Sequence, residues 1–176
     1  MMDWILEAMQ LKVSLSSNSI DEAIEALKKY NQELERKAEL LVKQLGEEGY
    51  KLVRLNLADI HYTGELQSSV HLKQDRLYAR ISVNSKHAIY VEFGTGSKGA
   101  STPYIGDNDI GWQYNIGETI GWYNINGVMK YGWFYYDGLI GRYRFTEGMP
   151  SRPFMYDSAT TLRYEKLINI VNEVFG

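Results

Sequence analysis

Apolar residues recur at alternating four- and three-residue steps in the first third of the chain. The positions of this series are Ile20, Ile24, Leu27, Asn31, Leu34, Ala38, Leu41 and Leu45, and Asn31 is the one member that is not apolar. A mean spacing of 3.5 residues places these side chains along one stripe, here called the seam, of an α-helix of about seven turns. Two uses of the seam stay open: packing on a sheet of the same chain, which is the commoner case, or pairing with a copy of the same helix.

The boundaries of this helix are predicted from capping residues and glycines. Residues 11–15 alternate between apolar and polar side chains, which predicts a short strand before the helix. Ser19 is a candidate N-cap, because Glu22 follows three residues later and completes a capping box. Gly46 and Gly49 are expected to end or kink the helix, and residues 50–60 to form a second one.

The rest of the chain predicts a small sheet and a last helix. Residues 70–72 and 77–83 read as strands, with Ala79, Ile81 and Val83 on one face. An apolar segment over residues 87–93 is followed by glycines, and a helix is predicted over residues 156–175. We therefore expect an α+β fold in one domain, residues 1–176, with a long N-terminal helix and a C-terminal helix packed on a small, mainly antiparallel sheet.

Residues 97–148 form an insert of different composition. Residues 104–145 hold 12 of the 23 aromatic residues and 8 of the 16 glycines, so this part of the chain has its own character. Gly-Trp occurs three times, ending at Trp112, Trp122 and Trp133. Asn126-Gly127 between two aromatic runs is a strong signal for a two-residue hairpin turn. The insert is therefore predicted to be an aromatic β-hairpin region.

Composition and charge exclude several classes of protein. The chain has no cysteine, which removes disulfide scaffolds, zinc ribbons and cysteine nucleophiles. The formal net charge of −3 and a pI near 5.7 lack the basic excess of a protein that grips nucleic acid. No apolar run approaches the roughly 20 residues that a membrane span needs, and the first ten residues carry no basic segment of a signal peptide.

No constellation of catalytic or metal-binding residues is recognisable. His61, His71 and His87 lack a partner at ligand spacing, and the Gly-Thr-Gly-Ser-Lys-Gly run from residue 94 lacks the order of a phosphate-binding P-loop. The acidic loop at residues 107–118 matches three positions of a calcium loop but has Trp112 where the sharp turn needs glycine. We therefore predict no enzyme activity, no cofactor and no metal.

The aromatic insert has a second interpretation. The Gly-Trp runs at residues 121–127 and 132–138 resemble the repeats of choline-binding modules, whose rings stack on sugars or enclose quaternary ammonium groups. Only two such units are present, whereas repeat architectures usually need three or more. The alternative use is packing or a protein interface, with Trp112, Trp122, Trp133 and Tyr135 as candidate interface residues.

Three short motifs together resemble one family. The first is a Thr-Gly-x-Leu motif with a serine that follows, formed by Thr63, Gly64, Leu66 and Ser69. The second is a Tyr-Val-Glu-Phe-Gly-Thr-Gly motif, formed by Tyr90, Glu92, Phe93, Gly94, Thr95 and Gly96 with Val91. The third is a Pro-Phe motif that opens the final helix, at Pro153 and Phe154. Their order and spacing resemble those of the minor structural proteins of long-tailed phages, known as neck, head–tail joining or tail-completion proteins.

The resemblance implies a structural role. It implies a subunit of the head–tail junction or upper tail that forms a ring, expected to be a hexamer, and that contacts the head connector and the tail-terminator or tail-tube proteins. Genome DNA would pass through the lumen without specific binding. The protein would be made in the bacterial cytoplasm and reside in the virion. Compact members of the family pass almost directly from Gly-Thr-Gly to the Pro-Phe motif, so the insert is the main departure.

The motif residues are expected to act as scaffold. Thr63-Gly64 would form a tight turn, and Leu66 and Val70 would face the core. Tyr90 and Phe93 would pack on the long helix, while Glu92 would cap or pair nearby. Gly94 and Gly96 would allow a close approach of backbones, and Pro153-Phe154 would fix the last helix.

Overall fold

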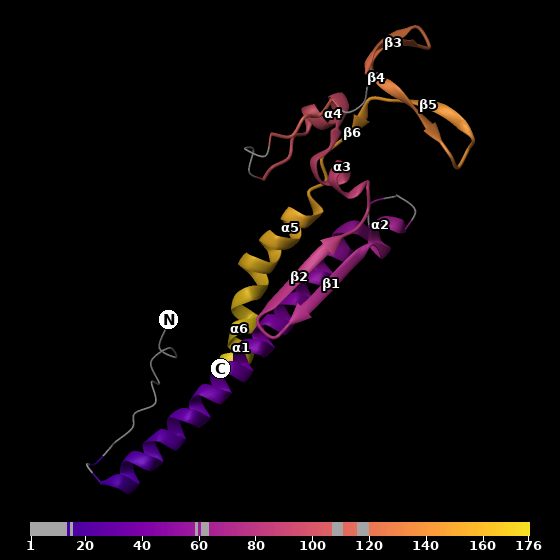
Figure 1. Ribbon diagram of the computed structural model, residues 1–176. Coiled ribbons are helices and arrows are strands. Elements are labelled where there is room, and N and C mark those ends of the chain that lie inside the picture. The colour runs from indigo at the N-terminus through magenta and orange to yellow at the C-terminus, as the bar shows by residue number, and fades with distance from the viewer. Residues whose placement is uncertain (1–13, 15, 59, 61–63, 107–110, 116–119) are drawn as a thin grey trace.

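The computed structural model describes residues 14, 16–58, 60, 64–106, 111–115 and 120–176. The strand predicted over residues 11–15 lies outside these residues except for Ser14, and Thr63, His61 and most of the acidic loop at residues 107–118 also lie outside them. The predicted α+β class is confirmed: long N-terminal and C-terminal helices accompany small antiparallel sheets (Figure 1).

Helix α1 (Ser17–Ala58) is a single element of 42 residues. It begins earlier than predicted, because the Ser19 amide donates to the Ser16 hydroxyl oxygen at 3.4 Å and the Ile20 amide to the Ser16 carbonyl at 3.1 Å. Ser16 is therefore the capping residue. The Ser19 hydroxyl instead accepts a hydrogen bond from the Ser14 amide at 2.9 Å, which holds the incoming chain.

Gly46 and Gly49 do not break α1, which corrects the expectation of two helices. Both glycines are buried in the helix, and each faces another element. A Cβ added at Gly46 would lie 2.7 Å from the Cβ of Ala79, and one at Gly49 would lie 2.8 Å from Cδ1 of Ile81. The glycines thus let a strand approach the helix backbone, and this packing outweighs their low helix propensity.

Strands β1 (Val70–Asp75) and β2 (Tyr78–Val83) form an antiparallel hairpin on α1. The predicted face is confirmed, since Ala79 and Ile81 are the residues that meet the two glycines. The turn lies at Arg76-Leu77, two residues later than expected, because β1 extends to Asp75. The short helices α2 (Glu65–Ser68) and α3 (Ala88–Phe93) flank the hairpin.

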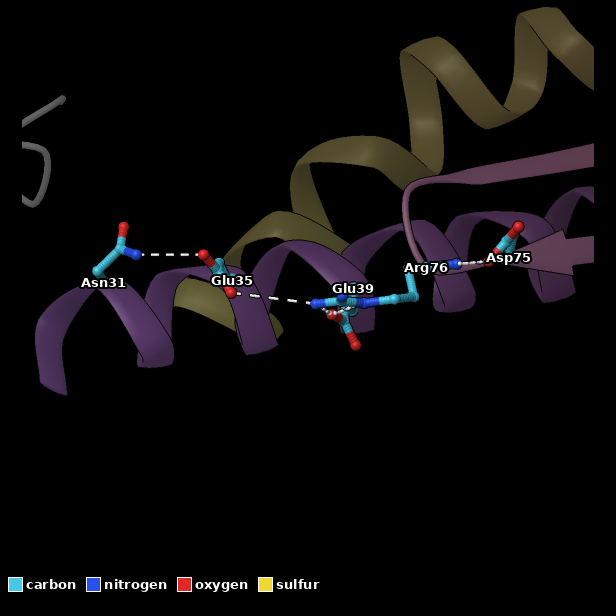
Figure 2. A network of polar contacts seen from close by, with 5 residues as sticks. All are labelled: Asn31, Glu35, Glu39, Asp75 and Arg76. Atoms are coloured by element: carbon cyan, nitrogen blue, oxygen red, sulfur yellow. Dashed lines mark hydrogen bonds and ion pairs between the residues drawn. The ribbon is translucent and has the colours of Figure 1, made fainter. Parts of the chain in front are cut away.

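The hairpin tip is fastened to α1 by a polar network (Figure 2). Nε of Arg76 donates to Oε1 of Glu39 at 2.6 Å, and its guanidinium lies 4.0 Å from Oε2 of Glu35. Asn31 continues the network, with its Nδ2 3.1 Å from Oε1 of Glu35. These side chains are exposed, so the network positions the tip more than it stabilises the fold.

The steric role of Gly46 gives a testable prediction. Gly46→Val should lower the free energy of unfolding by about 1–3 kcal/mol, because the added atoms push β2 away from α1. Urea denaturation monitored by circular dichroism measures the loss. Glu47→Val, on the exposed side of the same turn, is the matched control. A loss in Gly46→Val no larger than the loss in the control would mean that the approach of β2 does not require a glycine at position 46.

The C-terminal helix packs along α1 beside the hairpin (Figure 1). It consists of α5 (Phe154–Thr161), a π-helical segment η3 (Leu162–Lys166) and α6 (Leu167–Phe175). A π-helical turn adds a residue to the turn and rotates the helix that follows. This explains why Ile168, which an uninterrupted helix would place in the apolar stripe, is 56% exposed.

The core lies where α1, β1, α3 and the start of α5 meet. Its buried members are Val53, Leu57, Leu66, Val70, Val91 and Phe154. The insert extends from this end of the molecule, and the beginning of α1 lies at the opposite end (Figure 1).

The insert contains a helix α4 (Gly96–Ser101) and a separate sheet of order β3-β4-β5. The strands are β3 (Gly121–Ile125), β4 (Val128–Asp137) and β5 (Arg142–Thr146). The predicted hairpin turn is confirmed, since Asn126 and Gly127 have φ values of 53° and 84°, as a type I′ turn requires. The small sheet and the aromatic hairpin expected from the sequence are thus two separate sheets, and β5 is an addition to the predicted hairpin.

Candidate functional site: the motif junction and the aromatic insert

The three sequence motifs converge on one core. Leu66 of the first motif, Val91 of the second and Phe154 of the third are 2–4% exposed and belong to the same hydrophobic cluster. Gly64, which precedes α2, has a φ of 62°, the left-handed conformation expected for its turn. Segments separated by almost 90 residues in the chain are therefore held together by residues of the motifs.

Glu92 fixes the start of the last helix. Its carboxylate is 6% exposed and accepts the amides of Met155 at 2.9 Å and Tyr156 at 3.1 Å. These amides belong to the first turn of α5, where N–H groups have no partner within the helix. The Ser151 hydroxyl also donates to the Glu92 carbonyl at 2.7 Å. Glu92 thus caps α5 across the junction, as the sequence led us to expect.

Burial raises the pKa of Glu92 above its ordinary value, and the nearby carboxylate of Asp157 adds to this rise. The Met155 and Tyr156 amides lower the pKa but do not outweigh the loss of water. The folded protein therefore binds a proton at Glu92 more readily than the unfolded chain does.

The raised pKa of Glu92 predicts a pH dependence of stability. The contribution of protonated Glu92 is complete below the ordinary pKa of 4.5 and is lost as pH rises through the folded pKa. Glu92→Gln should abolish this component, so the difference in Tm between wild type and variant should change across that range. Glu165→Gln, at an exposed site on the last helix, is the control. Parallel Tm curves for wild type and Glu92→Gln would contradict the prediction.

Gly94, Thr95 and Gly96 join the core to the insert. Gly94 and Gly96 have φ values of 79° and 63°, and a Cβ added at Gly94 would lie 2.6 Å from the backbone nitrogen of Ser151. Thr95 pairs with Met149, and Gly96 pairs with Gly148 at the start of β6 (Gly148–Met149), as isolated antiparallel bridges. The close approach expected of the two motif glycines is present.

The rings of Tyr90 and Phe93 pack against the insert, and not against α1 as predicted. The Phe93 ring centroid lies 4.5 Å from that of Tyr104 and 5.1 Å from that of Trp112. Nε1 of Trp112 donates to the Gly94 carbonyl at 3.0 Å. Val91, between the two aromatic residues, is the side chain that enters the core. Trp112 therefore lies within the junction of its own chain.

The three-stranded sheet has one face lined by two groups of rings in contact, which together are here called the aromatic face. Its members are Tyr123, Phe134, Tyr136, Tyr143 and Phe145. Their centroids lie 5.2–5.8 Å apart in edge-to-face contacts. Tyr143 is 70% exposed, Tyr136 60% and Phe134 42%, so the face is open to solvent.

Apart from Trp112, the predicted interface residues lie on the other face of the sheet. The ring of Trp122 lies 5.4 Å from that of Tyr131, and the side chain of Trp122 is 67% exposed. Trp133 and Tyr135 follow Tyr131 at two-residue steps in β4 and share its side. The Gly-Trp repeats drew attention to this side. The signal for the aromatic face was the alternation of side chains along β4, counted from the Asn126-Gly127 turn, because every second residue points to the same face.

Among the residues described, no three His, Asp or Glu side chains cluster so as to hold a metal ion. No helix in the described part of the chain is long and apolar enough to cross a membrane. The motif residues lie where they pack, cap and turn the backbone.

Comparison with known families identifies the class. Residues 21–94 match the family HK97-gp10-like, described as bacteriophage HK97-gp10, putative tail-component. This segment is therefore similar to a family of putative phage tail components, which agrees with the resemblance predicted from the motifs. The match ends at Gly94, just before the insert at residues 97–148. No match was found among curated proteins or among solved structures.

Proposed function

We propose that this chain is a subunit of the phage head–tail junction or upper tail, where copies form a ring, expected to be a hexamer, that links the head connector to the tail. The observation that carries the proposal is the family match over residues 21–94, a segment that contains the seam from Ile24 onward, the first motif and the second motif up to Gly94. Its partners would be further copies of the chain, the head-closure or connector proteins and the tail-terminator or tail-tube proteins.

Two exposed apolar surfaces at opposite ends of the molecule support an assembling role. One is the first half of α1, where Ile20, Ile24, Leu27 and Leu34 are 43–53% exposed. The other is the aromatic face of the insert. Large exposed apolar surfaces mark interaction sites, and tyrosine, tryptophan and phenylalanine are enriched in protein interfaces. A subunit in a stack of rings needs contacts both within its ring and with the neighbouring rings.

The ring can be tested directly. Mass photometry and negative-stain microscopy of the purified full chain, alone and mixed with the tail-terminator protein of the same phage, should detect a ring. A chain that stays monomeric under both conditions would count against the proposal. DNA in the lumen would be held weakly, because the net charge is −3 and phosphate binding depends on Lys and Arg. A tight, salt-dependent gel shift would contradict this part.

A second candidate function is binding of cell-wall carbohydrate or choline by the insert, and the exposed ring of Trp122 favours it. However, the rings of the aromatic face contact one another edge to face, which leaves them as a packed row and not as a cage. Tryptophan fluorescence during titration with choline and muropeptide fragments decides between the two. A saturable change that is lost in Trp122→Ala and Trp133→Ala would favour the binding module.

A further inference from the structure

The first half of α1, residues 17–36, projects beyond the rest of the described chain (Figure 1). We call it the projecting half. Its seam residues Ile20, Ile24, Leu27 and Leu34 are 43%, 45%, 53% and 44% exposed. Four large apolar side chains on one helix stripe are therefore open to solvent at the end of the molecule opposite the insert.

The seam itself continues into the covered half of α1. Contacts from other described elements begin near residue 35, where Arg76 of the hairpin tip reaches Glu35 and Glu39. Nζ of Lys37 lies 5.8 Å from the ring centroid of Phe175 in α6. Ala38, Leu41 and Leu45 are partly buried there. The second half of the seam therefore packs against other elements of the chain. The first half has no such packing partner among the described residues.

The charged side chains of the projecting half show that only one stripe is suited to a partner. Glu25 pairs with Lys28 at 2.8 Å, and Glu33 pairs with Arg36 at 2.7 Å, both along the helix. In the heptad that the seam defines, Glu25, Glu33 and Arg36 occupy positions b, c and f, which face away from a helix partner. The projecting half thus combines one apolar stripe with a charged back, as a two-helix pair requires.

Asn31 indicates both the partner and its direction. Counting from the leucines at position d, Ile24, Asn31 and Ala38 fall at position a. An asparagine at this position favours paired helices that are parallel and in register, because the two amides then face each other. In an antiparallel pair, a position-a amide lies against an apolar residue and is desolvated without a partner. The Oδ1 atom of Asn31 remains available as an acceptor when Nδ2 donates to Glu35.

We propose that the projecting half of α1 pairs in parallel with the same segment of a second copy of this chain, with Asn31 facing Asn31 of the partner copy. The contact is short, so it is weak alone and is strengthened where other contacts hold the subunits together. The inference does not rest on the proposed ring. A parallel pair in register is related by a two-fold axis, whereas neighbours in a hexameric ring are related by a smaller rotation, so the helix pair and the ring are separate contacts.

The absence of cysteine from the sequence gives a direct test. Asn31→Cys in the full chain places a single thiol at the centre of the proposed contact, and mild oxidation should link most of the protein into a covalent dimer. Glu33→Cys, on the charged back of the same helix, is the matched control and should remain largely unlinked. Equal linking in the two variants, or none in either, overturns the proposal.

Sedimentation velocity over a range of concentrations provides the second measurement. Leu27→Asp places a charge in the seam and should raise the dissociation constant of the dimer by about tenfold or more. Lys29→Asp, on the charged back, changes the charge in the same direction and should leave the dissociation constant within about twofold. If the dissociation constant of the dimer is unchanged in Leu27→Asp, the pairing is wrong, whether or not rings form. If wild-type dimers form without rings, the pairing stands and the ring is wrong.

Discussion

Phe154→Ala is expected to lower the free energy of unfolding by about 3–5 kcal/mol. The Phe154 side chain is 3% exposed and belongs to the cluster in which the three motifs meet. Its removal leaves a cavity between α1, α3 and the start of α5, and these elements are joined through few other residues. Because folded domains have a free energy of unfolding of only about 5–15 kcal/mol, a large part of the stability would be lost.

Chemical denaturation, followed by far-ultraviolet circular dichroism, measures this loss. Tyr164→Ala removes an aromatic ring from the same C-terminal helix at a site that is 70% exposed, and it should change the free energy of unfolding by less than about 0.5 kcal/mol. A loss of less than about 1 kcal/mol in Phe154→Ala would show that the motifs are not held together by this core.

Gly96→Ala should separate the insert from the core. Gly96 has a φ of 63°, which costs an alanine about 1–2 kcal/mol. The added Cβ would also overlap the Glu147 carbonyl and lie 2.9 Å from Cζ3 of Trp133. Because backbone atoms have to move, the combined cost should reach about 3 kcal/mol or more, and the bridge between Gly96 and Gly148 should open.

Gly64→Ala is the matched control, since Gly64 has nearly the same φ, 62°, but nothing within 4 Å of the added Cβ. It should therefore show the conformational cost alone. Urea denaturation measures both variants, and limited proteolysis reports whether the insert is cut faster in Gly96→Ala. Equal losses of stability in the two variants would mean that the approach of residue 147 is not what requires a glycine at position 96.

The sequence predicted elements well where the pattern is local. The seam predicted α1, and the alternation of Ala79, Ile81 and Val83 predicted the inner face of the β1–β2 hairpin. Asn126-Gly127 predicted the type I′ turn between β3 and β4 of the insert. Each signal depends on residues a few positions apart, so the chain itself determines it. The three motifs likewise predicted a structural family before the residues that connect them were known.

The predictions that were wrong concern contacts between residues far apart in the sequence. Gly46 and Gly49 indicate a break when α1 is considered alone, but β2 needs the space above them. Tyr90 and Phe93 have ordinary aromatic side chains that could pack on any surface, and Tyr104 and Trp112 of the insert decide which one. The rotation caused by η3 has no simple sequence signal, so the exposure of Ile168 does not follow from the helical period of residues 156–175.

The two ends of the insert leave and re-enter the core side by side, at Thr95 with Met149 and Gly96 with Gly148. Closing a loop between fixed ends becomes costlier only with the logarithm of its length, by about 0.6 kcal/mol for each doubling. Natural selection can therefore lengthen, shorten or exchange the segment between these bridges at little cost in chain entropy. The same core can serve descendants that differ in what they carry at this one place, which agrees with a family match that stops at Gly94.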